Sequence, residues 1–174
     1  TIAGYVGYRP DDHGNTSATA TALPASSQIN AAGLIENRSD VDVFGFQSAA
    51  GTVNINVTGD VPSPNVDLLV ELLDASGAVL ATNNPDTSLN ATVTASVPAG
   101  SYYLRVGGVG YGTTTVGYSD YASLGQYTVT GTVPQPTANP PVANAQSVTT
   151  AEDTAVAITL TGSNPDGGTL SFTV

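Results

Sequence analysis

Oxygen-bearing side chains are concentrated in two short segments of the sequence. Residues 11–15 read Asp-Asp-His-Gly-Asn and supply side-chain and backbone oxygens within one turn of chain. Asp40 and Asp42 flank the start of a predicted strand. Ca²⁺ is a hard cation that binds about six to eight oxygens from carboxylates, amides and backbone carbonyls. We therefore take Asp12, Asn15, Asp40 and Asp42 as candidate calcium ligands.

A purely structural role is the alternative for these acidic residues. Asp11 and Asn15 are common Asx-turn residues, and Asp40 fits a solvated charge at the entry to a strand. Asp42 favours a ligand role, because it shares a predicted strand face with Phe44, where burial of an unpaired carboxylate is costly. The sequence leaves both alternatives open.

Catalytic chemistry has little support in the sequence, which contains one histidine and no lysine or cysteine. His13 has Asp11 and Asp12 beside it, but the chain contains no Gly-x-Ser-x-Gly and no His-Glu-x-x-His segment. A zinc site would need several more nitrogen or sulfur ligands. We therefore expect His13 to be a structural loop residue and the protein to have no catalytic activity of its own.

One pair of carboxylates, Asp67 and Glu71, has the composition of a glycoside hydrolase site. Both lie on one predicted strand among leucines, and nothing in the sequence marks an active cleft around them. We expect Asp67 to anchor the turn at residues 65–67 and Glu71 to pair with one of the few arginines.

Tyrosines are the candidates for binding a larger ligand. A tyrosine ring offers a large flat surface with a polar tip, which suits contacts with an extended peptide or a sugar. Tyr103 shares its predicted strand face with Arg105, and Tyr111 lies in a long glycine-rich loop. We take Tyr103 and Tyr111 as candidate ligand-binding residues, and expect Tyr118 and Tyr121 to fix that loop onto the rest of the domain.

Composition bounds the class of protein. The 174 residues include three basic and fourteen acidic side chains, which gives a net charge of −11. This balance excludes binding to a phosphate backbone, which needs clustered Lys and Arg. Hydrophobic residues make up 40% of the chain, enough for a packed core. No apolar run approaches the roughly 18 residues that a membrane helix needs.

The elements that must position these residues are predicted to be strands. Hydrophobic and polar residues alternate in the segments 41–46, 53–58 and 126–133, and turn residues separate the strands at intervals of about ten residues. This pattern predicts an all-β protein with a β-sandwich. Residues 107–125 are glycine-rich and tyrosine-rich, and we predict a long loop there.

The chain is predicted to contain more than one domain. Residues 10–133 form the β-sandwich, and residues 134–141 are a Pro-rich, extended linker. Residues 142–174 resume the alternating pattern, but about three strands cannot bury a core alone. We expect them to be the first part of a second, truncated β domain, and residues 1–9 to be the end of an upstream domain or linker.

An ordered set of motifs runs through the predicted sandwich. The motifs are Asp11–Thr16, Gly33–Glu36, Ser39–Phe46, Asn65–Asp67, Leu72–Gly77, Pro98–Val106, Gly117–Tyr121 and Gly125–Tyr127. Over about residues 8–133, this set resembles the bacterial pre-peptidase C-terminal domain. The resemblance implies a jelly-roll-like antiparallel β-sandwich that is appended to a secreted peptidase, especially a metallopeptidase.

The resemblance also implies where calcium ligands lie. Calcium-binding members of that family take them from the acidic segment before the sandwich and from the Asp-x-Phe strand, which here gives Asp12, Asn15 and Asp42. Gly14 and Ser39 stand where other members can have carboxamide or carboxylate groups. Residues 139–172 separately resemble the start of a bacterial cadherin-like or Ig-like repeat.

These observations lead to a functional expectation. We expect a non-catalytic accessory module of a secreted or cell-surface bacterial protein, rigidified by Ca²⁺, that retains its parent at an extracellular protein or polysaccharide. Its partners would be that ligand and the parent's catalytic domain, without nucleic acid or membrane. The alternative is a structural spacer or an export and maturation domain with no ligand of its own.

Overall fold

A computed structural model describes residues 9–113, 115–165 and 168–173. The chain divides into two compact units, residues 1–135 and residues 136–174, which are described separately. Residues 1–8 of the predicted upstream segment lie outside the described residues. No helix in the described ranges is long and apolar enough to cross a membrane.

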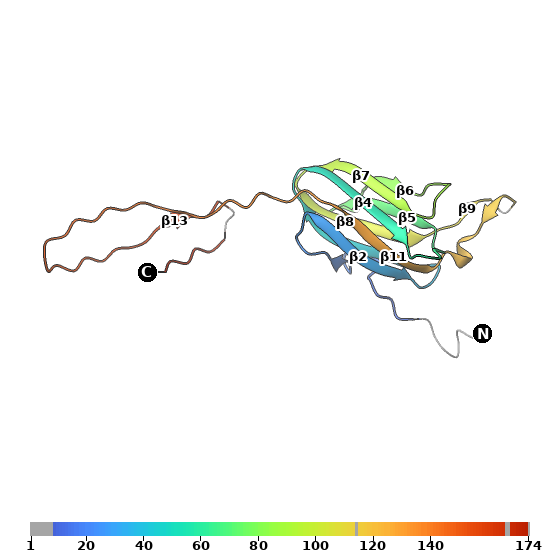
Figure 1. Ribbon diagram of the computed structural model, residues 1–174, viewed down its shortest axis with the longest axis horizontal. Coiled ribbons are helices and arrows are strands. Elements are labelled where there is room, and N and C mark those ends of the chain that lie inside the picture. Colours follow the sequence, from blue (N-terminus) through green and yellow to red (C-terminus); the bar gives the residue numbers. More distant parts are fainter. Residues whose placement is uncertain (1–8, 114, 166–167, 174) are drawn as a thin grey trace. The chain divides into compact units, whose positions relative to one another are not determined.

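Two sheets form the first unit (Figure 1). One sheet has the order β1-β3-β8-β5-β6, with β1 (Thr21–Ala22), β3 (Val41–Ser48), β8 (Gly100–Gly108), β5 (Leu68–Asp74) and β6 (Val79–Asn83). The other has the order β2-β11-β4-β7, with β2 (Gln28–Ile35), β11 (Gly125–Thr132), β4 (Gly51–Gly59) and β7 (Ala91–Val97). Apart from the short parallel pair β1–β3, the neighbouring strands are antiparallel. The predicted all-β sandwich is confirmed.

The core lies between the two sheets and follows the alternation of the sequence. Val53, Ile55 and Val57 of β4 are fully buried, while the residues between them are exposed or half-buried. Phe44 of β3 lies opposite Leu104 of β8, and both are fully buried in the same hydrophobic cluster. Strand β4 therefore buries every second side chain, as expected when one face meets a core and the other meets water.

A hairpin joins β5 to β6 with the turn chemistry that the sequence predicts. Asp74 Oδ1 accepts hydrogen bonds from the backbone N–H groups of Ser76 and Ala78, at 2.8 and 3.0 Å. Gly77 has a φ of +86°, which favours glycine. These bonds lower the pKa of Asp74, mainly through the Ser76 hydroxyl.

The segment 107–125 is more ordered than the predicted long loop. After β8 it forms a small antiparallel pair, β9 (Tyr111–Gly112) and β10 (Gly117–Tyr118), and then the short 3-10 helix η1 (Asp120–Ala122). Figure 1 shows β9 protruding beyond the two sheets. The prediction of a loop without strands is therefore wrong here, because the turn glycines hide a two-residue pairing that is too short to show periodicity.

The second unit contains one short pair in its described residues, β12 (Val142–Ala143) with β13 (Gly162–Ser163). The predicted strand at residues 156–160 has no sheet partner among the described residues. Apolar side chains in this unit stay substantially exposed: Val148, Val156, Ile158, Leu160 and Phe172. The described strands of this unit are too few to enclose a core.

Candidate metal centre

Five carboxylates from three segments meet beside β3. One oxygen each from Asp11, Asp40 and Asp42 lie within 4.8 Å of one another. One oxygen each from Asp11, Asp12 and Glu36 satisfy the same limit. The two groups share Asp11, so the five side chains form one cluster, which we call the acidic centre. Hard divalent cations prefer oxygen-only surroundings of this kind.

The acidic segment is held against β3 by its neighbours at residues 14 and 15. The backbone N–H of Val41 donates to Asn15 Oδ1 at 2.7 Å, and Asn15 Nδ2 donates to Asp11 Oδ2 at 2.8 Å. The backbone N–H of Val43 donates to the Gly14 carbonyl at 3.1 Å. These bonds fix Asp11 and Asp12 beside Asp42, which lies between the two anchored residues of β3.

His13 also holds the acidic segment in place, through hydrogen bonds to β1 and β2. Its Nε2 donates to the Ala32 carbonyl at 2.8 Å, and its Nδ1 lies 2.8 Å from Thr21 Oγ1. The ring packs on Phe44 with the ring centres 4.5 Å apart. His13 is therefore occupied on both nitrogens by groups from β1 and β2, which is the contact pattern of a structural residue.

Asp42 is the deepest member of the acidic centre, with no exposed surface. The hydroxyl of the buried Tyr127 donates to Asp42 Oδ2, while Asp42 Oδ1 has no hydrogen-bond partner among the described residues. Burial, reinforced by the neighbouring Asp40 and Asp12 charges, raises the pKa of Asp42 to about 7, against the lowering effect of the Tyr127 hydrogen bond. An unpartnered carboxylate oxygen inside a protein is costly, so this atom is a candidate cation ligand.

Gly33 of β2 lies directly over the contact between Asp42 and Tyr127. A Cβ at Gly33 would fall 2.3 Å from the Tyr127 hydroxyl oxygen and 2.8 Å from Asp42 Oδ2. Tyr127 pairs with Gly33 in the register of β11 and β2, so its side chain occupies the space that a larger residue would need. The absence of a side chain at position 33 therefore leaves space for the Tyr127 hydroxyl, which donates to Asp42 Oδ2.

Glu36 closes the other side of the acidic centre. Its backbone N–H donates to Asp40 Oδ2 at 2.9 Å across the turn between β2 and β3. Both carboxylate oxygens of Glu36 are buried and have no hydrogen-bond partner among the described residues. Burial and the adjacent Asp40 carboxylate raise the pKa of Glu36 to about 8.

The structure places the four predicted metal ligands in two different roles. Asp12, Asp40 and Asp42 belong to the acidic centre, whereas Asn15 lies beside it and uses its oxygen to accept the Val41 N–H. The backbone oxygen of Gly14 is similarly occupied. Sequence reasoning did not select Glu36, although its spacing of four residues from Asp40 around an Asn-Arg-Ser turn is a usable signal.

The two predicted ligand-binding tyrosines lie on different elements. Tyr103 is a half-buried residue of β8 beside Gly45, in a hollow of about 310 Å³. Tyr111 is exposed on β9, and its ring packs on Tyr118 with the ring centres 6.1 Å apart. Tyr103 lies five residues before the end of β8 at Gly108, so about 17 Å of strand separate it from that end, and β9 begins three residues later.

The remaining predicted contacts can be located in the structure. Asp67 is buried, and the Tyr118 hydroxyl donates to its Oδ2 at 2.9 Å, which fixes the segment after β8 onto the sandwich. Arg105 Nε donates to Glu71 Oε2 at 2.6 Å on the outer face of the sheet. Tyr121 is 74% exposed, so its ring is not a packing contact of this kind.

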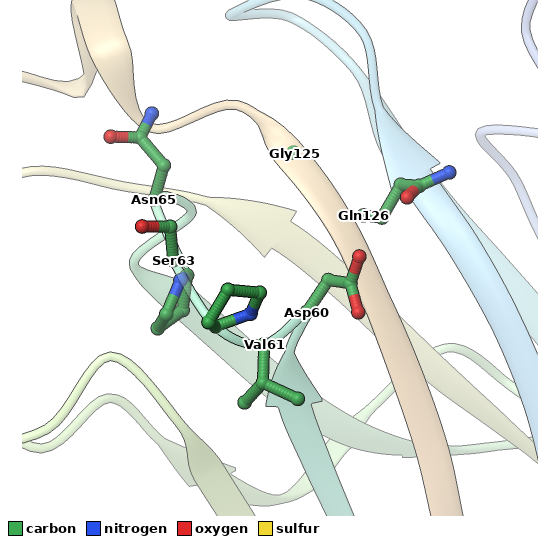
Figure 2. A pocket seen from close by; sticks show the side chains of 8 residues that line it. Asp60, Val61, Ser63, Asn65, Gly125 and Gln126 are labelled. Carbon is green, nitrogen blue, oxygen red and sulfur yellow. The ribbon is translucent and has the colours of Figure 1, made fainter.

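The surface near the acidic centre is hollowed beside β11. Asp60, Val61, Pro62, Ser63, Pro64 and Asn65 line a hollow of about 220 Å³ together with Gly125 and Gln126. Figure 2 shows Asn65 at one end of this hollow and the side chains of Asp60 and Gln126 at the other. A second hollow of about 250 Å³ shares Asp60 and Gln126 and extends to Asp12 of the acidic centre.

Comparisons with known proteins concern the fold. No protein-family model matches the chain, and no curated protein matches it. The pre-peptidase C-terminal domain of a collagenase from Bacillus anthracis is structurally similar, with a TM-score of 0.45 and 18% identity over 70% of this chain and 95% of that chain. PliG from Salmonella Typhimurium, a periplasmic inhibitor of g-type lysozyme, has a TM-score of 0.40 and 14% identity over 65% of this chain and 96% of that chain.

Proposed function

We propose that residues 10–133 are a non-catalytic, extracellular accessory module that binds Ca²⁺ at the acidic centre and retains its parent protein at a ligand. The observation that carries the proposal is that Glu36 and Asp42 have buried carboxylate oxygens without hydrogen-bond partners among the described residues. Three of their buried oxygens have no hydrogen-bond partner among the described residues, and other carboxylates crowd them. A divalent cation supplies the missing positive charge and the missing partner at once.

Calcium fits the donor set better than zinc or magnesium. The donors are carboxylates, and no sulfur ligand is present. The one imidazole, His13, already makes hydrogen bonds with Ala32 and Thr21. Zn²⁺ prefers Cys and His, and Mg²⁺ requires near-ideal octahedral geometry, whereas Ca²⁺ accepts irregular arrangements of oxygens. Bound Ca²⁺ would join Asp11 and Asp12 to Asp40 and Asp42, and so tie the acidic segment to the turn between β2 and β3.

Retention at an insoluble ligand is the role that we propose for the module. Binding of an insoluble ligand raises the effective concentration of a tethered parent at its substrate without new chemistry. The candidate contact residues are Tyr103 and Tyr111, and the candidate ligands are an extracellular protein or polysaccharide. Extracellular modules bind Ca²⁺ with dissociation constants of about 10⁻⁴ to 10⁻³ M, so such a module would be rigid outside the cell.

Thermal unfolding in EDTA and in about 10 mM CaCl₂ tests the proposal. At roughly 100 times the dissociation constant, binding to the folded state adds about 2.7 kcal/mol, which corresponds to a rise of roughly 8–10 °C in the unfolding midpoint. We expect this rise in the wild type and its loss in Asp42→Asn and Asp12→Asn. Asp86→Asn changes the charge equally at an exposed position outside the acidic centre and should keep the rise.

The outcomes separate calcium binding from a general charge effect. An equal rise in all four proteins would mean that Ca²⁺ screens the net charge of −11 without a site. The absence of any rise in the wild type would remove calcium from the proposal and leave a spacer as the better function.

A further inference from the structure

Three hollows follow one another along the beginning of β11. The hollow that reaches Asp12 shares Asp60 and Gln126 with the one in Figure 2. The hollow in Figure 2 in turn shares Pro64 and Asn65 with a third, which Tyr118 also lines. Because neighbouring hollows have lining residues in common, they adjoin one another in a row, which we call the β11 groove.

The size of each hollow suits one side chain. Their volumes are about 250, 220 and 290 Å³, each below the roughly 300–1,000 Å³ of a pocket that encloses a small molecule. A row of small hollows matches an extended chain that places successive side chains along its length. A compact ligand would fill only one of them.

At the end of the β11 groove that reaches Asp12, the charge of the lining residues determines which side chains are favoured. Asp12 and Asp60 both line it, and Asp60 is exposed. Of the three basic residues of the chain, Arg38 is paired with Asp120 and Arg105 with Glu71.

Arg9 is the third basic residue, and it lines the same hollow. Arg9 and Asp60 form no ion pair in the described structure, so the exposed Asp60 carboxylate can accept a basic side chain while Asp12 belongs to the acidic centre. A net charge of −11 adds a long-range attraction for cations.

The far end of the β11 groove is less polar. Pro64, Leu89 and Ala122 line the third hollow, and Tyr118 closes it with its hydroxyl held by Asp67. An apolar side chain is the natural occupant of such a hollow.

Between the two ends, Gln126 is exposed on β11. Its side-chain amide makes no hydrogen bond with any described residue. A primary amide offers both a donor and an acceptor, which is what the backbone of an extended peptide requires. Tyr118 is the one exposed ring among the described residues that line the three hollows, since Tyr127 is buried. The β11 groove therefore lacks the row of exposed aromatic faces on which sugars stack.

We propose that the β11 groove binds an extended peptide segment, with a basic side chain against Asp60 and an apolar side chain beside Tyr118. This inference rests on the proposed retention function and names the ligand class, which is protein and not polysaccharide. It also assigns the contact role to Tyr118, which lines the β11 groove, whereas Tyr103 and Tyr111 do not line it.

Amide chemical-shift titration by NMR in about 10 mM CaCl₂ tests the proposal. The probes are three acetylated and amidated peptides, (Arg-Gly-Leu-Pro)₃, (Glu-Gly-Leu-Pro)₃ and (Arg-Gly-Ser-Pro)₃, in which proline keeps the chain extended. We expect the first peptide to shift the amides of Asp60, Asn65, Gln126 and Tyr118, and the second to shift none of them. The third should shift the acidic end only.

Asp60→Asn and Asp86→Asn form a matched pair of variants. Loss of one exposed ion pair weakens binding about two- to fivefold, so we expect that loss for Asp60→Asn and none for Asp86→Asn. Shifts spread evenly over the acidic surface, with equal affinity in both variants, would overturn the proposal. So would equal shifts of the same amides by chitohexaose or cellohexaose.

The calcium-induced rise in the unfolding midpoint, measured on the same samples, separates the two proposals. A retained rise without peptide binding overturns the β11 groove alone, and loss of the rise overturns the calcium-binding module.

Discussion

The buried carboxyl group of Asp42 makes the stability of the protein depend on pH. Its carboxylate is fully buried and keeps one unpartnered oxygen, and Glu36 nearby keeps two. In the metal-free protein the charged forms of both groups are disfavoured. Burial and neighbouring carboxylates therefore raise the pKa of Asp42 to about 7 and that of Glu36 to about 8.

The stability of the metal-free protein should consequently fall as the pH rises. The folded state binds more protons than the unfolded state between the ordinary pKa values, 3.8 and 4.5, and the folded values of about 7 and 8. The stabilisation is fully present below the unfolded values and is lost as the pH rises through the folded ones. Urea unfolding in EDTA should give a lower midpoint at pH 8.5 than at pH 5.5.

Asp42→Asn removes one of these titrations and should flatten the pH dependence of that midpoint. Asp74, whose pKa is lowered, acts in the opposite direction: its contribution is present above the ordinary value of 3.8 and is lost as the pH falls from there through the lowered folded pKa. In saturating CaCl₂ the trend should reverse, because protons compete with the cation for the same oxygens. A midpoint in EDTA that rises from pH 5.5 to 8.5 would contradict the assignment of buried, neutral carboxyls.

At the residue level, the sequence predicts part of the acidic centre. Asp42 is identifiable because a carboxylate in phase with Phe44 has to be buried, and both residues are buried. Glu36 is not identifiable with the same rule, since it lies just beyond the end of β2, where polar residues are ordinary. Its membership depends on how the turn between β2 and β3 folds back onto Asp40, which is a property of three-dimensional packing.

At the level of the elements, β2 and β11 are constrained by the absence of a side chain at Gly33. Substitution by alanine would place a Cβ 2.3 Å from the Tyr127 hydroxyl, inside van der Waals contact, and Tyr127 is buried and cannot swing away. We expect Gly33→Ala to lower the free energy of unfolding by about 1–3 kcal/mol, as overpacking does.

Gly45→Ala on β3 is the matched control for Gly33→Ala. There the nearest atom would be Tyr103 Cε1 at 3.4 Å, an ordinary contact. The control should stay within about 0.5 kcal/mol of the wild type in urea unfolding. Equal effects of the two substitutions would show that glycine in a strand, and not the contact above Asp42, sets the stability.

Most of the strands can be predicted from the sequence, because a strand that buries only one of its faces alternates hydrophobic and polar residues. Residues 53–57 and 126–133 alternate because each sheet has one core face, and the structure buries the predicted side chains. The pair of β9 and β10 was not predictable, because two paired residues on each strand give no measurable period. Residues 156–160 are the opposite case, because alternation is present there without a strand or sheet partner in the described chain.

At the scale of the whole molecule, the function depends on whether the module holds its parent at an insoluble ligand. The protein has a strong negative charge, and the β11 groove has an acidic end and an apolar end, which together favour a basic protein over a neutral polysaccharide. A calcium-dependent retention on protein matrices is therefore expected, and a spacer would show none.

Co-sedimentation with insoluble collagen, chitin and cellulose distinguishes these functions. We expect the chain to sediment with the protein matrix in CaCl₂, to be released by EDTA, and to bind chitin and cellulose no more than an unrelated β-sandwich of similar charge. Because an electrostatic contribution is screened beyond a Debye length of about 10 Å at 0.1 M salt, raising the salt to about 0.5 M should weaken the retention. Asp42→Asn should resemble the wild type in EDTA, whereas Asp60→Asn should be retained more weakly than the wild type and keep the calcium-induced rise in the unfolding midpoint. If no matrix retains the wild type above the control protein, the module acts as a spacer, and calcium then serves only to stiffen it.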